Sequence, residues 1–170
     1  LTPWSSMGPV QSTSSFEITS GPNGAPCANT KAERPFNPTM SAGVQSPSAA
    51  THSPFSLRLT RPDGHQELSS LNLQMPEGVT AKLAGVASCP DATLAAISEA
   101  EGTGAAENAS PSCPASSQIG TATVGVGAGS TPHYVQTGKA YLAGPYKGAP
   151  LSLAVVVPAL AGPFDLGSEV

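Results

Sequence analysis

Three cysteines carry the most reactive side chains of this chain: Cys27, Cys89 and Cys113. A zinc site needs four ligands with closely spaced pairs such as Cys-x-x-Cys, and none of the histidines lies at such a spacing from a cysteine. A thioredoxin-type redox pair also needs two cysteines only a few residues apart. The spacing therefore favours a disulfide between Cys89 and Cys113, and we expect no metal and no cofactor.

This disulfide would close a loop of about 25 residues, for which chain entropy gives a stabilisation of roughly 3.5 kcal/mol. Because such bonds persist in oxidising compartments, it predicts an exported protein, located at the cell surface or outside the cell. Cys27 lies in the loop-like stretch "GPNGAPCANT" and is left over. We expect its partner in a part of the precursor outside this sequence; a reactive thiol or an intermolecular bridge is the alternative.

Residues for acid–base and nucleophilic chemistry are scattered rather than grouped. No serine lies in a Gly-x-Ser-x-Gly elbow, the strained turn that exposes the nucleophile of many hydrolases. His52, His65 and His133 border turns or proline-containing loops, where an exposed polar residue is ordinary. We therefore expect no catalytic residues and no enzymatic activity in this chain.

A binding site for carbohydrate is the more specific alternative. Sugars stack on exposed aromatic rings, and Tyr146 lies beside Lys147 in the turn-like stretch "AGPYKGAP", from which a ring can project. The competing interpretation is a tyrosine that simply packs over its turn. Tyr146 and Lys147 are the candidate ligand-binding residues.

Charge and length exclude several classes of partner. The chain has 170 residues, of which 11% are charged, and its net charge is -4. It has no cluster of Lys and Arg, so the electrostatic signature of a nucleic-acid binder or of a protein bound to an anionic membrane is missing. No apolar run approaches the about 18 residues needed to span a bilayer, so we expect no membrane insertion of this segment.

Alternating apolar residues predict a series of short strands. In "FSLRLT", Phe55, Leu57 and Leu59 share one side, as in a half-buried strand. A Pro-Asp-Gly turn follows, so residues 55–60 are predicted to form a hairpin with residues 70–75. Residues 21–53 are rich in Pro, Gly and Asn and are predicted to be loop. The further predicted strands are 14–20, 78–86, 117–127, 134–144, 151–157 and 164–170.

Only residues 89–102 have a helical pattern. Ser88 is placed to cap this helix with Asp91 three residues later, and Pro90 suits a first turn. The stretch behind it, 101–110, is predicted to be flexible and to be held by the disulfide. A single helix among many strands predicts an all-β fold.

We expect an antiparallel β-sandwich with Greek-key connections, Ig-like or jelly-roll-like, with one short helical insertion at about 89–113 tied by the disulfide. One domain is expected over 15–170, preceded by an N-terminal extension over 1–14. The strand pattern of the last predicted strand continues up to Val170, so we expect the domain to be truncated at its C-terminus.

Several local motifs resemble a domain of large exported proteins of actinobacteria whose role is uncharacterised. The resemblance covers most of the chain from about Ser15 onward. The motifs that carry it are "MPEG" at 75–78, "AGV" at 84–86, the paired Cys-Pro steps at 89–90 and 113–114, "SQIG" at 117–120 and "YLAGP" at 141–145. The resemblance implies a secreted or cell-surface multi-domain protein of bacterial origin and brings no catalytic residues with it.

These observations predict a non-enzymatic structural or adhesion module of an exported surface protein, whose partners are other domains of the same precursor. A carbohydrate- or cell-wall-binding module that recognises extracellular glycans is the first alternative. An accessory domain of a secreted hydrolase is the second.

Overall fold

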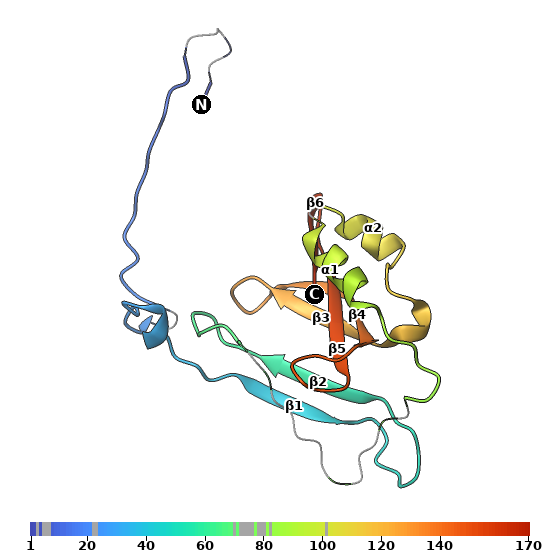
Figure 1. Cartoon of the computed structure of the whole chain (residues 1–170). Coiled ribbons are helices and arrows are strands. Elements are labelled where there is room, and N and C mark those ends of the chain that lie inside the picture. Colours follow the sequence, from blue (N-terminus) through green and yellow to red (C-terminus); the bar gives the residue numbers. More distant parts are fainter. Residues whose placement is uncertain are drawn as a thin grey trace. The chain divides into compact units, whose positions relative to one another are not determined.

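The structure is a computed structural model, which describes residues 1–2, 4, 8–21, 24–69, 71, 77, 81, 83–100 and 102–170 (Figure 1). The chain divides into two compact units, residues 1–73 and 74–170, where the sequence predicted one domain over 15–170. Both units are antiparallel β structures, so the predicted all-β class is confirmed. Each unit is described by itself below.

The first unit contains a two-stranded antiparallel sheet and a short 3-10 helix. Strand β1 pairs with β2 along its whole length, from Thr39 opposite Thr60 to Val44 opposite Phe55. The strand predicted over 55–60 is therefore confirmed, whereas β1 lies in a passage that was predicted to be loop. The elements of this unit are η2 Lys31–Glu33, β1 Thr39–Val44 and β2 Phe55–Thr60.

Two predictions for this unit do not hold. Residues 14–20 form no strand. An alternating segment becomes a strand only where a second strand completes the hydrogen-bond ladder, and within the described residues no strand pairs with this segment. Phe55, Leu57 and Leu59 do not form a buried side, since every residue of β2 is exposed. The predicted partner strand over 70–75 lies outside the described residues except for Leu71, which is in no strand.

The second unit contains a four-stranded antiparallel sheet in the order β3-β4-β5-β6. Neighbours in the sheet are thus neighbours in sequence, and the described strands contain no Greek-key crossover. These four strands agree with those predicted over 117–127, 134–144, 151–157 and 164–170. The elements of this unit are α1 Asp91–Glu99, α2 Gly104–Ala109, η3 Ala115–Ser117, β3 Gln118–Val126, β4 His133–Ala143, β5 Ser152–Ala161 and β6 Phe164–Glu169.

Part of the strand predicted over 78–86 lies outside the described residues. The described end of it, Leu83 to Val86, forms a turn in which the amide of Val86 donates to the carbonyl of Leu83. No extended strand is present over 83–86.

The helical insertion contains two helices rather than one. Cys89 is still extended, with its amide donating to the carbonyl of Leu142 at 2.8 Å, so α1 begins only after Pro90. The predicted cap by Ser88 is wrong for this reason: Pro90 occupies the N-cap position, and no side chain caps the helix. Residues 104–109, predicted to be flexible, form α2. Both helices contact the end of the sheet formed by β5 and β6 (Figure 1).

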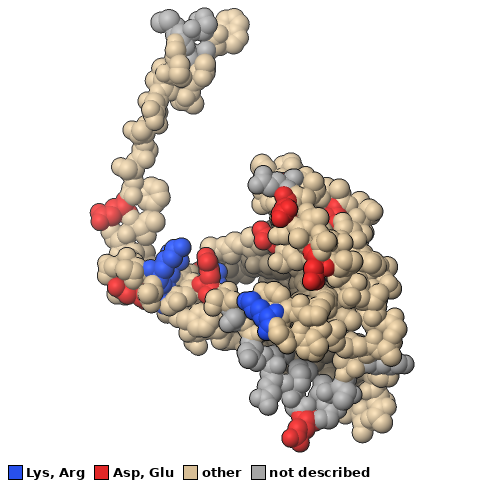
Figure 2. All heavy atoms as spheres, in the orientation of Figure 1, with Lys and Arg blue, Asp and Glu red and all other residues tan. Residues whose placement is uncertain are grey.

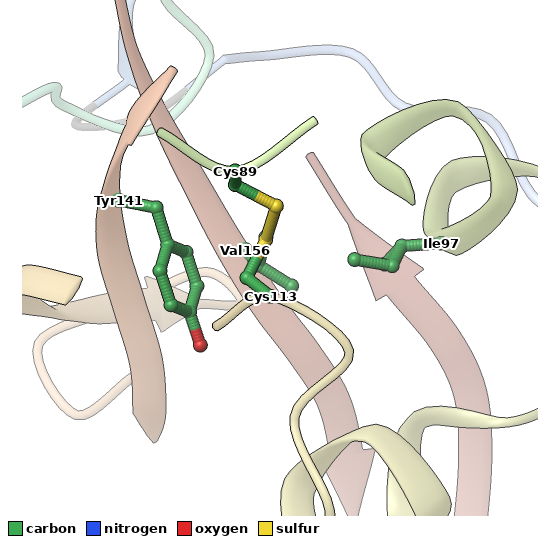
Figure 3. Close-up of a cluster of buried hydrophobic side chains, with 5 residues drawn as sticks. All are labelled: Cys89, Ile97, Cys113, Tyr141 and Val156. Carbon is green, nitrogen blue, oxygen red and sulfur yellow. A yellow bond between two sulfur atoms is a disulfide. The ribbon is translucent and has the colours of Figure 1, made fainter. Parts of the chain in front are cut away.

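The buried core of the second unit lies between the helices and the sheet. It consists of Cys89, Ile97, Cys113, Tyr141 and Val156, with Leu94 packed against it (Figure 3). The disulfide thus lies inside the core and not at its surface.

Candidate functional site

The predicted disulfide between Cys89 and Cys113 is present, and its two Cα atoms are 5.3 Å apart. Figure 3 shows Ile97 reaching from α1 toward the disulfide, with Val156 beneath it and the ring of Tyr141 beside it. Burial raises the pKa of the Tyr141 hydroxyl, and the negative charge of Glu107 raises it further. The side chains of this cluster are buried, so it stabilises the fold and exposes almost no surface to solvent.

The candidate binding residues Tyr146 and Lys147 lie in the connection between β4 and β5. The amide of Tyr146 donates to the carbonyl of Ala149 at 3.0 Å, and the amide of Ala149 donates back to the carbonyl of Tyr146 at 2.9 Å. The two residues between them, Lys147 and Gly148, have positive φ angles of 47° and 86°. This is the geometry of a type I′ turn, the tight turn that suits a β-hairpin.

Lysine is an unusual residue for the first position of such a turn. Its Cβ makes the left-handed conformation unfavourable by about 1–2 kcal/mol, which asparagine or glycine would largely avoid. Backbone strain of this kind gathers at functional positions. The Lys147 side chain lies at the tip of the turn, beside the ring of Tyr146.

The base of this turn is held by the rest of the unit. The hydroxyl of Ser152 donates to the carbonyl of Gly144 at 2.8 Å. Gly144 also lies close to the beginning of α1, because a Cβ added to it would be 3.3 Å from a carboxylate oxygen of Asp91. The end of β4 that leads into the turn therefore lies next to the beginning of α1.

At the tip, an aromatic ring and an ammonium group face solvent together. Tyr146 is 60% exposed, so it does not pack over its turn as the competing interpretation required. The Nζ atom of Lys147 lies 5.1 Å from the centre of the Tyr146 ring, a cation–π distance. A ring of this kind offers a stacking surface for the C–H face of a sugar, and the ammonium offers three donors to hydroxyl or carboxylate oxygens.

A groove of about 500 Å³ lies between the two helices. Its lining is mostly small and includes one buried acidic side chain, Glu107. The carboxylate of Glu107 accepts hydrogen bonds from the Ser112 amide, at 3.0 and 3.1 Å, and from the Ser112 hydroxyl, at 2.6 Å. Glu107 therefore fixes the segment that leads to Cys113.

A second carboxylate, Asp165, joins α2 to β6. It accepts hydrogen bonds from the amides of Gly104 at 2.8 Å, Ala105 at 2.9 Å and Gly167 at 3.0 Å. The bond from Ala105, followed by those from Gly167 and Gly104, lowers the pKa of Asp165. Gly104 permits this close approach, because a Cβ there would overlap the carbonyl oxygen of Gly167.

Sequence reasoning did not find the roles of Glu107 and Asp165. Nothing in the sequence around either residue distinguishes it from the other acidic residues, of which the chain has eleven in all. Asp165 is 61 residues from Gly104, and no local pattern connects the two.

The remaining candidate groups do not converge on a site. Cys27 is free and exposed, and its Sγ lies 3.6 Å from the carbonyl oxygen of Ile18. The ring of His65 accepts from the amide of Asn37, and that of His133 lies 3.3 Å from the carbonyl of Leu160. Within the described residues, no three His, Cys, Asp or Glu side chains gather as metal ligands would.

Two further observations concern the surface. No helix within the described ranges has the length and apolarity needed to cross a membrane. The visible surface carries few charged side chains, with isolated acidic and basic residues between wide uncharged areas (Figure 2).

Comparisons with protein-family models, with curated proteins and with solved structures give no match for this chain.

Proposed function

We propose that this chain is a non-enzymatic structural or adhesion module of an exported surface protein. The observation that carries the proposal is the buried disulfide between Cys89 and Cys113. Two cysteines that fill the centre of a hydrophobic core as a disulfide are formed in an oxidising compartment, as in secreted and cell-surface proteins.

The arrangement around the disulfide supports the same function. The carboxylate of Asp165 holds α2 to β6, and the carboxylate of Glu107 holds α2 to the segment that leads to Cys113 in the disulfide. Each of these carboxylates accepts hydrogen bonds from backbone amides. The partners that fit such a module are other domains of the same precursor. We further propose that the fold is a β-sandwich, Ig-like or jelly-roll-like.

Proteolytic shaving of intact cells of the source organism tests this proposal. Trypsin added to intact cells is expected to release peptides of this chain. Because no Lys or Arg lies between Lys82 and Lys139, Cys89 and Cys113 fall in one tryptic peptide, and non-reducing mass spectrometry is expected to find this peptide lighter by two hydrogen atoms than after reduction. Release of these peptides only after lysis, with both thiols free, would contradict the proposal.

A second function, binding of carbohydrate or cell-wall polymer, is favoured by one specific observation. The strained turn at Lys147 places an ammonium group beside a tyrosine ring that is largely exposed. Exposed aromatic rings with nearby donors are the usual means by which β modules hold sugars.

Glycan-array and cell-wall pull-down measurements test this second function. Wild type is expected to bind, and Tyr146→Ala is expected to bind at least about tenfold more weakly, since the stacking surface is lost and the Lys147 ammonium loses its cation–π contact. Tyr134→Ala is the matched control, because Tyr134 is a similarly exposed tyrosine elsewhere on the sheet. Absence of binding by wild type, or an equal loss in both variants, would remove this function.

A further inference from the structure

The helical insertion carries the whole net charge of the chain. Residues 89–113 contain four acidic residues and no Lys or Arg. The other seven acidic residues are equal in number to the seven basic residues, all of which lie outside this segment, so the net charge of -4 belongs to the insertion. A negative charge that is concentrated in one part of a protein attracts cationic partners to that part. The acidic residues of the insertion are Asp91, Glu99, Glu101 and Glu107.

The groove between α1 and α2 lies within this acidic segment, since all of its lining residues fall between Ala92 and Ser112. Much of its lining is alanine, whose short side chain lets a ligand approach the helices closely. The groove is open, because Ala96, Thr103 and Ala106 line it and are themselves exposed. A site for a small molecule usually encloses most of its ligand, so an open groove is better suited to a chain that lies along it.

The wall of the groove contains one buried charge. Glu107 lines the groove and is 8% exposed. Within the described residues, the hydrogen bonds to its carboxylate come from Ser112, and no cation neutralises it. Ser112 supplies two donors, an amide shared between both oxygens and a hydroxyl, whereas a carboxylate has about four lone-pair sites. Glu107 therefore keeps acceptor sites for a cation in the groove.

We propose that this groove binds a Lys or Arg side chain carried by a peptide segment of another polypeptide. These side chains have an aliphatic stem and a cationic head, and the groove offers a matching surface for each. The stem lies against the alanines of α1 and α2, and the head pairs with Glu107. Asp91 and Glu99 do not line the groove, and their charge steers the segment toward it. That the partner is a polypeptide rests on the proposed structural role as well as on the open shape of the groove.

Titration of the isotope-labelled chain with penta-lysine, followed by NMR, tests the proposal. The amide signals of α1 and α2 are expected to shift and to saturate at about 1 mM penta-lysine or below, with no comparable shifts in β1 and β2. Penta-glutamate is expected to cause no shifts. Raising the NaCl concentration from about 50 to 500 mM is expected to weaken binding, because salt screens the attraction between the charges.

Two variants separate binding in the groove from attraction to the acidic insertion as a whole. Glu107→Gln removes the charge in the groove at nearly constant side-chain size and is expected to weaken binding at least about tenfold. Ala96→Leu fills the groove, changes no charge and is expected to weaken binding to a similar extent. Ala95→Leu is the matched control, because Ala95 is also exposed on α1 and does not line the groove, and it is expected to bind as wild type does.

The NMR spectrum of each variant also shows whether that variant is folded. Absence of saturable shifts in wild type, or equal binding by Ala96→Leu and Ala95→Leu, overturns the proposal, as does undiminished binding by a folded Glu107→Gln. Butylamine that binds as tightly as penta-lysine would also overturn it, because the occupant would then be a small amine and not a peptide. Binding in the groove does not require export, so this titration and the proteolytic shaving of cells can fail independently.

Discussion

The hairpin β1–β2 and the sheet β3–β6 are both regular antiparallel structures, yet only the sheet has a core. Every residue of β1 and β2 is exposed, although β2 shows the clearest apolar alternation in the chain. In the sheet, Tyr141 is 1% exposed, and Val156 and the two linked cysteines are similarly buried. The two units therefore use the same backbone pairing with different results.

The difference lies in what covers the strands. A two-stranded hairpin has no second layer of its own and is marginally stable in water. Two short helices contact the sheet of the second unit, and they are too small to be held by burial alone. The disulfide ties the segments that flank them, and the carboxylate of Asp165 joins α2 to β6. Burial in this protein thus depends on attachment of the covering layer more than on the apolar pattern of a strand.

Removal of the disulfide should change the stability of the sheet unit, relative to the hairpin β1–β2, more than any other substitution considered. Replacing both Cys89 and Cys113 by Ala is expected to lower the free energy of unfolding of the sheet unit by about 3.5 kcal/mol, because the loop of roughly 25 residues is no longer closed in the unfolded chain. Urea denaturation followed by circular dichroism measures this. The hydrogen-exchange rates of the amides of β1 and β2 should stay unchanged. Faster exchange in these two strands would contradict the contrast between the units.

A matched pair of truncations should give the next largest effect. Ile97→Ala is expected to cost about 2–4 kcal/mol, because Ile97 is 5% exposed and its removal leaves a cavity beside the disulfide. Leu57→Ala on β2 is expected to cost less than about 1 kcal/mol, since Leu57 is 41% exposed. The same denaturation experiment compares the two. Equal costs would show that the hairpin has a core of its own.

The attachment of α2 by Asp165 should give the smallest effect, and one that depends on pH. The folded state lowers the pKa of Asp165 below its ordinary 3.8, so its stabilising contribution is present above about pH 4 and is lost as the pH falls through the folded-state value. Asp165→Asn is therefore expected to be less stable than wild type at pH 7, with the difference shrinking on acidification. Melting temperatures between pH 7 and pH 2.5 measure this.

Glu169→Gln is the control for this prediction, because it removes a charge four residues further along the same strand. Its loss of stability at pH 7 should be smaller than that of Asp165→Asn. A difference between wild type and Asp165→Asn that stays constant with pH would mean that the carboxylate does not hold the helix through its charge.

Local patterns predicted the elements that depend on local chemistry. Strand β2 and the four strands of the sheet were expected from alternation and turn residues, and the disulfide was expected from the spacing of three cysteines. Helix α2 was missed because its six residues include a glycine and an asparagine and begin with no side-chain cap from the same segment. Its N-terminal amides are satisfied by Asp165, which no window of neighbouring residues contains.

For the candidate binding site, too, local sequence predicted one part and the structure supplied the other. Tyr146 and Lys147 were chosen from the Gly/Pro-rich stretch around them, and the structure adds the strained type I′ turn and the cation–π contact that bring the two side chains together. Their binding role stays a prediction.

The sequence by itself determined the β class, the disulfide and the scarcity of charge, since each depends on residue type and on spacing along the chain. Tertiary structure alone decided which alternating strands are buried and which carboxylate caps α2. The physical reason is that burial and capping each need a partner, and in a β protein that partner comes from a distant part of the chain.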